Sequence, residues 1–91
     1  MDILNISFSD MSERDLAHSC LVNTKLQWAN ISNSNASHSN FSGANLRNAN
    51  FSGRDLTFAN LSGSDLTGSK FDGACLRGIN FTGAIGLHEN T

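Results

Sequence analysis

Two histidines, His18 and His38, carry side chains that could bind a metal ion or change charge near neutral pH in this 91-residue chain. They lie twenty residues apart, and Cys20 and Cys75 supply the only thiols. A structural zinc site needs four converging ligands. Because so few candidates are present, we expect no metal site, and we interpret both histidines as solvated, structural side chains.

Catalytic motifs are equally weak. Residues 63–70, with the sequence GSDLTGSK, superficially resemble a phosphate-binding loop, but Lys70 follows Ser69 instead of preceding a serine or threonine. Serine and asparagine are so abundant that any Ser/His/Asp triplet comes from a biased pool. A core filled with Leu and Phe leaves no obvious cavity for a substrate. We therefore expect no catalytic residue, no cofactor and no enzymatic activity.

The pattern that must position these side chains is an apolar residue at every fifth place from Ile6 to Phe81. A period of five fits neither the 3.6 residues of a helical turn nor the alternation of a flat strand. In a chain that is 38% hydrophobic, sixteen successive matches have a chance probability on the order of 10⁻⁷. The sixteen positions are Ile6, Met11, Leu16, Leu21, Leu26, Ile31, Ala36, Phe41, Leu46, Phe51, Leu56, Leu61, Leu66, Phe71, Leu76 and Phe81.

The other places of the repeat indicate how the chain turns. A small residue usually stands two places before the apolar residue, and Asn or Asp usually stands directly before it. Ser or Thr often follows it, and Gly comes two places after it at 43, 53, 63, 68, 73, 78 and 83. Gly, Asn, Asp and Ser accept turn geometry, so each repeat is one short extended step and one turn. The same observation excludes a helix.

The steps Ala44-Asn45-Leu46, Ala49-Asn50-Phe51, Ala59-Asn60-Leu61 and Ala74-Cys75-Leu76 resemble the A-(D/N)-L-x-x consensus of the pentapeptide-repeat family. The resemblance implies an all-β fold, a right-handed quadrilateral parallel β-helix of about four coils. The apolar place and the small place would point inward. We expect a single domain over residues 1–91, with repeats at about 4–84 and a short tail at 85–91.

Twenty residues make one coil of such a fold, so residues twenty apart share a column. Phe8 and Trp28 fall in one outward column, and His18, His38 and Phe58 fall in another on the opposite side. Large rings in a place otherwise held by Gly are candidates for a protein-contact surface. The alternative is simple stacking of neighbouring side chains from coil to coil. By the same geometry His18 and His38 would lie about 5 Å apart.

Arg14 and Arg54 depart from the repeat, because each occupies the small inward place of the same column. A guanidinium group cannot remain unpaired in a dry core. Either the corner opens enough for the side chain to reach water, or the local register is distorted. A tolerated irregularity and a binding site for a partner's acidic groups both remain open.

Charge and cysteine usage restrict the setting. The net charge of −2 and the six scattered Lys and Arg residues argue against direct nucleic-acid binding. Neither a signal peptide nor a membrane-spanning stretch is recognisable. Cys20 and Cys75 would lie nearly three coils apart, too far for a disulfide. We expect free thiols, a cytoplasmic location and no membrane contact.

Two functions fit these observations. The first is a rigid, non-enzymatic module that binds a protein partner whose identity the sequence does not reveal. The alternative follows from the resemblance, because some family members are DNA mimics that bind topoisomerases such as DNA gyrase. That role needs a long and continuously acidic surface.

The ends of the solenoid should favour assembly, because exposed sheet edges are normally covered. We predict a homodimer joined end to end through the C-terminal coil, with Ile79, Phe81, Ile85 and Leu87 in its interface. The alternative is that this chain is a domain whose natural neighbour covers the end.

Overall fold

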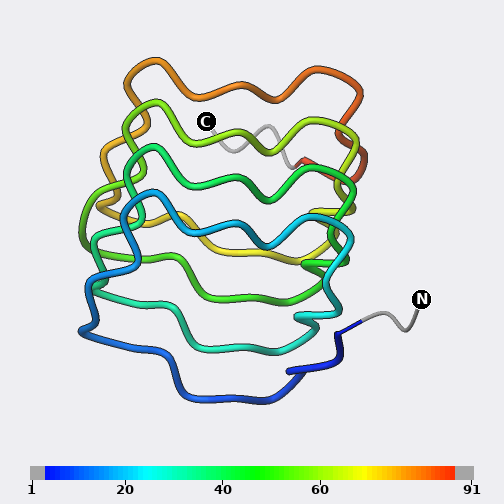
Figure 1. The fold of residues 1–91 in the computed structure, drawn as a ribbon, viewed down its shortest axis with the longest axis horizontal. Coiled ribbons are helices and arrows are strands. Elements are labelled where there is room, and N and C mark those ends of the chain that lie inside the picture. Colours follow the sequence, from blue (N-terminus) through cyan, green and yellow to red (C-terminus); the bar gives the residue numbers. More distant parts are fainter. Residues whose placement is uncertain (1–3, 88–91) are drawn as a thin grey trace.

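The computed structural model describes residues 4–87, so the last four residues of the expected tail at 85–91 lie outside the described residues. Residues 4–87 contain no helix and no strand longer than one residue. Their extended structure consists of thirteen single parallel bridges, each joining residues twenty apart, from Asn5 with Lys25 to Asp65 with Ile85. Figure 1 shows the resulting coils stacked along one axis. The structure therefore confirms a stacked parallel coil with four repeats per turn.

A regular repeat inside the solenoid uses all five of its backbone N–H groups, as residues 45–49 illustrate. The N–H groups of Leu46 and Asn48 donate to carbonyls of the following coil, at 2.9 and 2.8 Å. The N–H of Asn45 donates to the preceding coil, and the N–H of Ala49 closes the turn on the Leu46 carbonyl, both at 3.0 Å. The fifth N–H, that of Arg47, donates to Asn45 Oδ1 at 3.2 Å. Coil stacking is thus stabilised mainly by main-chain hydrogen bonds.

The Asn or Asp before each apolar residue therefore has a specific role. Its side-chain oxygen accepts the one turn N–H that cannot reach another coil, as Asn50 does for Ser52 and Asp65 does for Thr67. This is an Asx turn, in which the side chain substitutes for a backbone acceptor. Cysteine and lysine side chains cannot accept in this way. The repeats with Cys20, Lys25, Lys70 or Cys75 in this place show no such bond among the described residues.

The third residue of each turn has a positive φ, which a type II turn requires. Gly occupies many of these places, as the sequence indicates, but nine other residues adopt φ between 56° and 63°. Five of the nine carry rings, namely Phe8, His18, Trp28, His38 and Phe58. A bulky side chain in this region is unusual, and the strained backbone conformation costs about 1–2 kcal/mol per residue. The corners are therefore the places where the sequence departs most from what the backbone prefers.

The core lies in the middle coils. Its fully buried members come from the apolar and small places of residues 24–66, including Leu26, Phe41, Leu46 and Leu61. Aromatic rings continue this core toward the C-terminus, with Phe51 stacked on Phe71 at 5.3 Å between ring centroids. Most inward residues of the first and last coils are only partly buried against it, and Leu76 is 36% exposed. Both ends of the solenoid consequently leave apolar surface uncovered.

Arg14 and Arg54 both reach solvent, and the column that holds them is distorted as well. Both arginines are exposed, the chain bends at Arg54, and the preceding Gly53 has a φ of 103°. Neither arginine N–H closes its turn; that of Arg14 donates to Ser34 Oγ at 3.1 Å instead. Ser34 Oγ in turn donates to the carbonyl of Met11 at 2.7 Å. The side chains therefore reach water as the first explanation requires, whereas the register is kept, because Asp15 and Asp55 still pair with residues twenty places away.

Candidate interaction surface

The column of His18, His38 and Phe58 forms as the twenty-residue spacing predicts. The two imidazole rings stack with centroids 5.0 Å apart, and His38 stacks on Phe58 at 5.2 Å. The next position in the column is Gly78, and the Phe58 ring covers the space that a side chain there would need. The three rings therefore form a continuous stack on one corner of the solenoid.

The column of Phe8 and Trp28 also forms, but more loosely. Its ring centroids lie 6.4 Å apart, and 57% of Trp28 remains exposed to solvent. Trp28 follows His18 by ten residues, half a coil, so the two columns stand on opposite sides of the solenoid. The five predicted contact residues are thus brought together as two separate surfaces.

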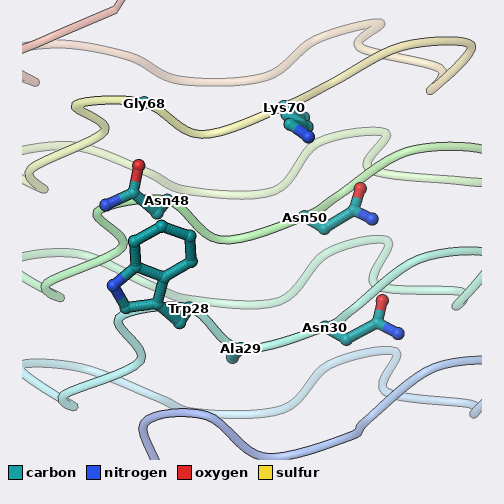
Figure 2. A pocket seen from close by; sticks show the side chains of 7 residues that line it. All are labelled: Trp28, Ala29, Asn30, Asn48, Asn50, Gly68 and Lys70. Carbon is teal, nitrogen blue, oxygen red and sulfur yellow. The ribbon is translucent and has the colours of Figure 1, made fainter.

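A shallow hollow of about 300 Å³ adjoins Trp28. Its lining consists of Trp28, Ala29, Asn30, Asn48, Asn50, Gly68 and Lys70. Figure 2 shows the Trp28 indole beside Asn48, and shows Asn30, Asn50 and Lys70 one above another on successive coils. The sequence analysis missed this row of polar residues, although their spacing of twenty places them in one column.

The polar side of the hollow presents hydrogen-bond donors. The Oδ1 atoms of Asn30 and Asn50 accept the N–H groups of Ser32 and Ser52, both at 3.0 Å. Their Nδ2 groups therefore remain available as donors, and the ammonium group of Lys70 extends the row. An oxygen-bearing group next to an apolar one would find complementary partners in this hollow.

The carboxylates of the surface are held by short local contacts. Hydrogen bonds from Thr57 lower the pKa of Asp55, and hydrogen bonds from Thr67 lower the pKa of Asp65. The Asp10 pKa is lowered in the same way by Ser12. Asp65 also forms an exposed ion pair with Arg47 at 3.4 Å. Each of these carboxylates stabilises a turn of the backbone, because it accepts hydrogen bonds from the residue two places on.

His18 and His38 lie together, but no third metal-binding side chain among the described residues joins them. No three of the His, Cys, Asp and Glu side chains within residues 4–87 come close enough to share a metal ion. Cys20 and Cys75 are both exposed free thiols. Within the same range, no segment forms the long apolar helix that could cross a membrane.

The predicted dimer residues lie at the C-terminal end of the solenoid. Ile79 and Phe81 are partly buried and pack against the core. Ile85 and Leu87, which begin a fifth coil, are 61% and 44% exposed. The four residues therefore lie in the last complete coil and directly beyond it.

The family model for pentapeptide repeats matches residues 9–48 and 44–83 of the chain, with eight copies. The chain belongs to the pentapeptide-repeat family. This confirms the resemblance seen in the Ala-Asn-Leu steps. A search of curated protein sequences found no match.

Solved structures of pentapeptide-repeat proteins share the fold. The chain is similar to alr5209 from Nostoc Pcc 7120, with a TM-score of 0.84 and 24% identity over 87% of this chain and 65% of that one. It is also similar to Rfr23 from the cyanobacterium Cyanothece 51142, with a TM-score of 0.51 and 29% identity over 89% of this chain and 63% of that one. This pentapeptide-repeat chain thus spans less than two thirds of either structure.

A third pentapeptide-repeat structure is that of QnrB1, a plasmid-mediated fluoroquinolone resistance protein, with 24% identity and a TM-score of 0.46 over 89% of this chain and 54% of that one. A likeness at this level carries no argument about function.

Proposed function

We propose that this chain is a rigid, non-enzymatic interaction module built as a right-handed quadrilateral β-helix. It binds a protein partner through the hollow beside Trp28 and through the corner formed by Phe8 and Trp28. The observation that carries the proposal is the exposed Trp28 ring at a φ of 63°, where Gly or Asn would fit with less strain. Contiguous exposed rings on a soluble domain are typical of contact surfaces.

Stacking alone accounts for the two ring columns unequally. The His18, His38 and Phe58 rings approach to 5.0 and 5.2 Å, within the range of favourable aromatic pairs. The Phe8 and Trp28 rings are 6.4 Å apart, and more than half of Trp28 is exposed. Exposure does not separate the two columns, because Phe58 is 55% exposed; the Trp28 column differs in its looser stacking and in the hollow beside it.

The chemistry of the hollow indicates what part of a partner would fit. Trp28 offers a flat apolar face, and Asn30, Asn50 and Lys70 offer donors. An apolar side chain next to a carboxylate or a carbonyl oxygen would match both. We propose that the partner contributes such a segment and that no cofactor, nucleic acid or membrane takes part. The exposed free thiols support a reducing, cytoplasmic setting.

The C-terminal coil is the second proposed contact, as the site of self-association. Ile85 and Leu87 are exposed, and Phe81 is only partly covered by the core. Exposed apolar side chains beside an open sheet edge favour docking of another edge. We propose a dimer of this chain that uses Ile79, Phe81, Ile85 and Leu87.

The alternative role, binding to a topoisomerase as a DNA mimic, has less support. Hydrogen bonds from Ser12, Thr57 and Thr67 lower the pKa values of Asp10, Asp55 and Asp65 most, and a nearby arginine lowers each of them a little further, namely Arg14, Arg54 and Arg47. Basic side chains between the acidic ones interrupt the continuous negative surface that mimicry of DNA needs. A DNA gyrase supercoiling assay separates the two functions, because only the mimic inhibits or protects the enzyme.

The experiment for the proposed function compares capture of cellular proteins by the wild-type chain, Trp28→Asn and Phe58→Asn. Asn48 adopts a φ of 60° in the Trp28 column, so asparagine is compatible with this backbone. We expect Trp28→Asn to lose specific partners at unchanged circular dichroism, and Phe58→Asn to keep them. Capture of the same proteins by all three chains would overturn the proposal.

A further inference from the structure

The ammonium group of Lys70 has no carboxylate partner among residues 4–87 and lies at the hollow beside Trp28. Lys70 is exposed and belongs to the lining of this hollow. The only ion pair within the described part of the chain joins Arg47 and Asp65. A positive charge beside an apolar ring favours a partner that carries a negative charge next to an apolar group.

Two amide groups precede this charge in the same column. Asn30, Asn50 and Lys70 follow one another one coil apart, and Figure 2 shows their side chains one above another. Neighbouring coils are about 4.8 Å apart along the axis, as neighbouring strands are. The Oδ1 atoms of both asparagines accept turn N–H groups, which leaves their Nδ2 groups as donors. Because a carboxylate has two accepting oxygens, it can bridge Asn50 and Lys70.

The two columns that flank the hollow change character in the same direction. The first column runs from large rings to glycine, through Phe8, Trp28, Asn48 and Gly68. The second column runs from an acidic through neutral to a basic residue, through Asp10, Asn30, Asn50 and Lys70. The end of the hollow nearer the N-terminus therefore offers rings beside a negative charge, and the other end offers a positive charge without rings.

We infer that the hollow binds an extended acidic segment of the protein partner, with a carboxylate between Asn50 and Lys70 and an apolar side chain on the Trp28 ring. This inference rests on the proposed function and names the chemistry of the segment that the hollow binds. The carboxylate lies toward the C-terminal coils, because Asp10 repels it from the other end of the column.

The positions of the two contacts restrict the spacing of the two groups in the partner. Trp28 and Asn50 lie on neighbouring coils, about 4.8 Å apart along the axis, and two residues apart around the coil, at most about 6.6 Å. In an extended peptide, side chains two places apart point to the same side at a separation of about 6.6 Å, whereas adjacent side chains point to opposite sides. The acidic and apolar residues of the partner are therefore two places apart.

Fluorescence of the chain reports on this hollow, because Trp28 is the only tryptophan in the sequence. The probe is the blocked peptide acetyl-Gly-Phe-Gly-Asp-Gly-amide, in which the aspartate carries the only charge. A phenylalanine ring that packs on the indole removes water from it, so we expect a saturable change of the Trp28 fluorescence.

Three altered peptides test the two groups and their spacing. Peptides with Asn in place of Asp, or with Ala in place of Phe, should bind about tenfold more weakly, because each lacks one of the two contacts. A peptide with Phe directly before Asp should bind about tenfold more weakly as well, since one of its side chains points away from the hollow. Equal affinity of this third peptide would overturn the assigned spacing.

Charge reversal at Lys70 tests the carboxylate contact from the side of the protein. Lys70→Glu should weaken binding of the aspartate peptide about tenfold. The same variant should bind acetyl-Gly-Phe-Gly-Lys-Gly-amide better than the wild-type chain does, because the opposite charges then meet again. Arg77→Glu is the matched control, since it makes the same change in net charge at an exposed residue outside the lining. It should leave the binding of both peptides unchanged.

The outcomes separate this inference from the proposed function. An unchanged affinity of the aspartate peptide for Lys70→Glu, or an equal loss for Arg77→Glu, would overturn the carboxylate contact. No saturable change of Trp28 fluorescence up to about 10 mM peptide would overturn the inference as a whole. If Trp28→Asn nevertheless loses its cellular partners, the proposed function stands and only the assigned segment is wrong. If all chains capture the same proteins, the proposed function fails whatever the peptides do.

Discussion

The ring of Phe58 lies against Gly78 of the following coil, so closely that a Cβ atom on Gly78 would come within 2.6 Å of Phe58 Cε1. Side chains at the corners thus lean toward the C-terminal neighbour and cover the next residue in the column. Asn23, Asn33 and Asn48 cover their glycines in the same way. At these four places the side chain one coil earlier fills the space that a side chain on the glycine would need.

Gly78→Ala should therefore destabilise the chain more than Gly63→Ala. Both glycines have a positive φ, 69° and 66°, so both substitutions carry a strain of about 1–2 kcal/mol. At Gly63 the nearest atom lies 3.8 Å from the added Cβ, which is ordinary contact. At Gly78 the Phe58 ring must also move. Urea denaturation midpoints measure the difference, and equal midpoints would contradict the close packing of Phe58.

Phe51→Asp should abolish cooperative unfolding, whereas Ser52→Asp should change stability little. Phe51 is buried, stacked on Phe71 at 5.3 Å and edge-on to Phe41 at 5.5 Å. A carboxylate there would have no partner and no access to water. Ser52 points outward and loses only its hydroxyl contact with Asn50. Thermal unfolding followed by circular dichroism tests this, and similar tolerance at both positions would refute the inward register.

The sequence predicts the columns well, because a parallel coil converts spacing along the chain into distance in space. His18, His38 and Phe58 stack as their spacing of twenty requires. The hollow beside Trp28 was not predicted, since it depends on where the Asn48 and Trp28 side chains lie. The sequence also indicates only a general turn preference for Asn and Asp. Their acceptance of one defined N–H emerges from the three-dimensional hydrogen bonds.

Acid should weaken the fold through Asp55, whose pKa is lowered chiefly by the side-chain and backbone hydrogen bonds from Thr57. A pKa lower in the folded than in the unfolded chain stabilises the fold above the unfolded value, and this contribution is lost as pH falls through the folded value. Asp55→Asn keeps an acceptor oxygen but cannot titrate. We expect this variant to lose less stability than the wild-type chain when the pH falls from about 6 to about 3, the range in which carboxylates titrate. Urea denaturation midpoints of both chains at the two pH values test this. An equal fall of the midpoint in both chains would exclude Asp55 as a contributor to the pH dependence of stability.

Arg54→Ala should stabilise the chain. Arg54 occupies the small place, the chain bends there, and its N–H does not close the turn on Phe51. Ala59 and Ala74 hold equivalent places, and their N–H groups close the turn at 3.0 Å. Alanine should therefore restore a hydrogen bond and a regular corner, for a gain of about 0.5–1.5 kcal/mol.

Amide hydrogen exchange provides the local readout for Arg54→Ala, because the N–H of residue 54 should become protected as the turn closes. Arg47→Ala is the control: Arg47 lies in a regular turn and is exposed, so its loss removes only a surface ion pair of small energy. If Arg54→Ala destabilises the chain and leaves the amide of residue 54 unprotected, the bend is intrinsic to this corner and the arginine is not its cause. A stabilised variant with a protected amide at residue 54 would show that the arginine itself opens this turn.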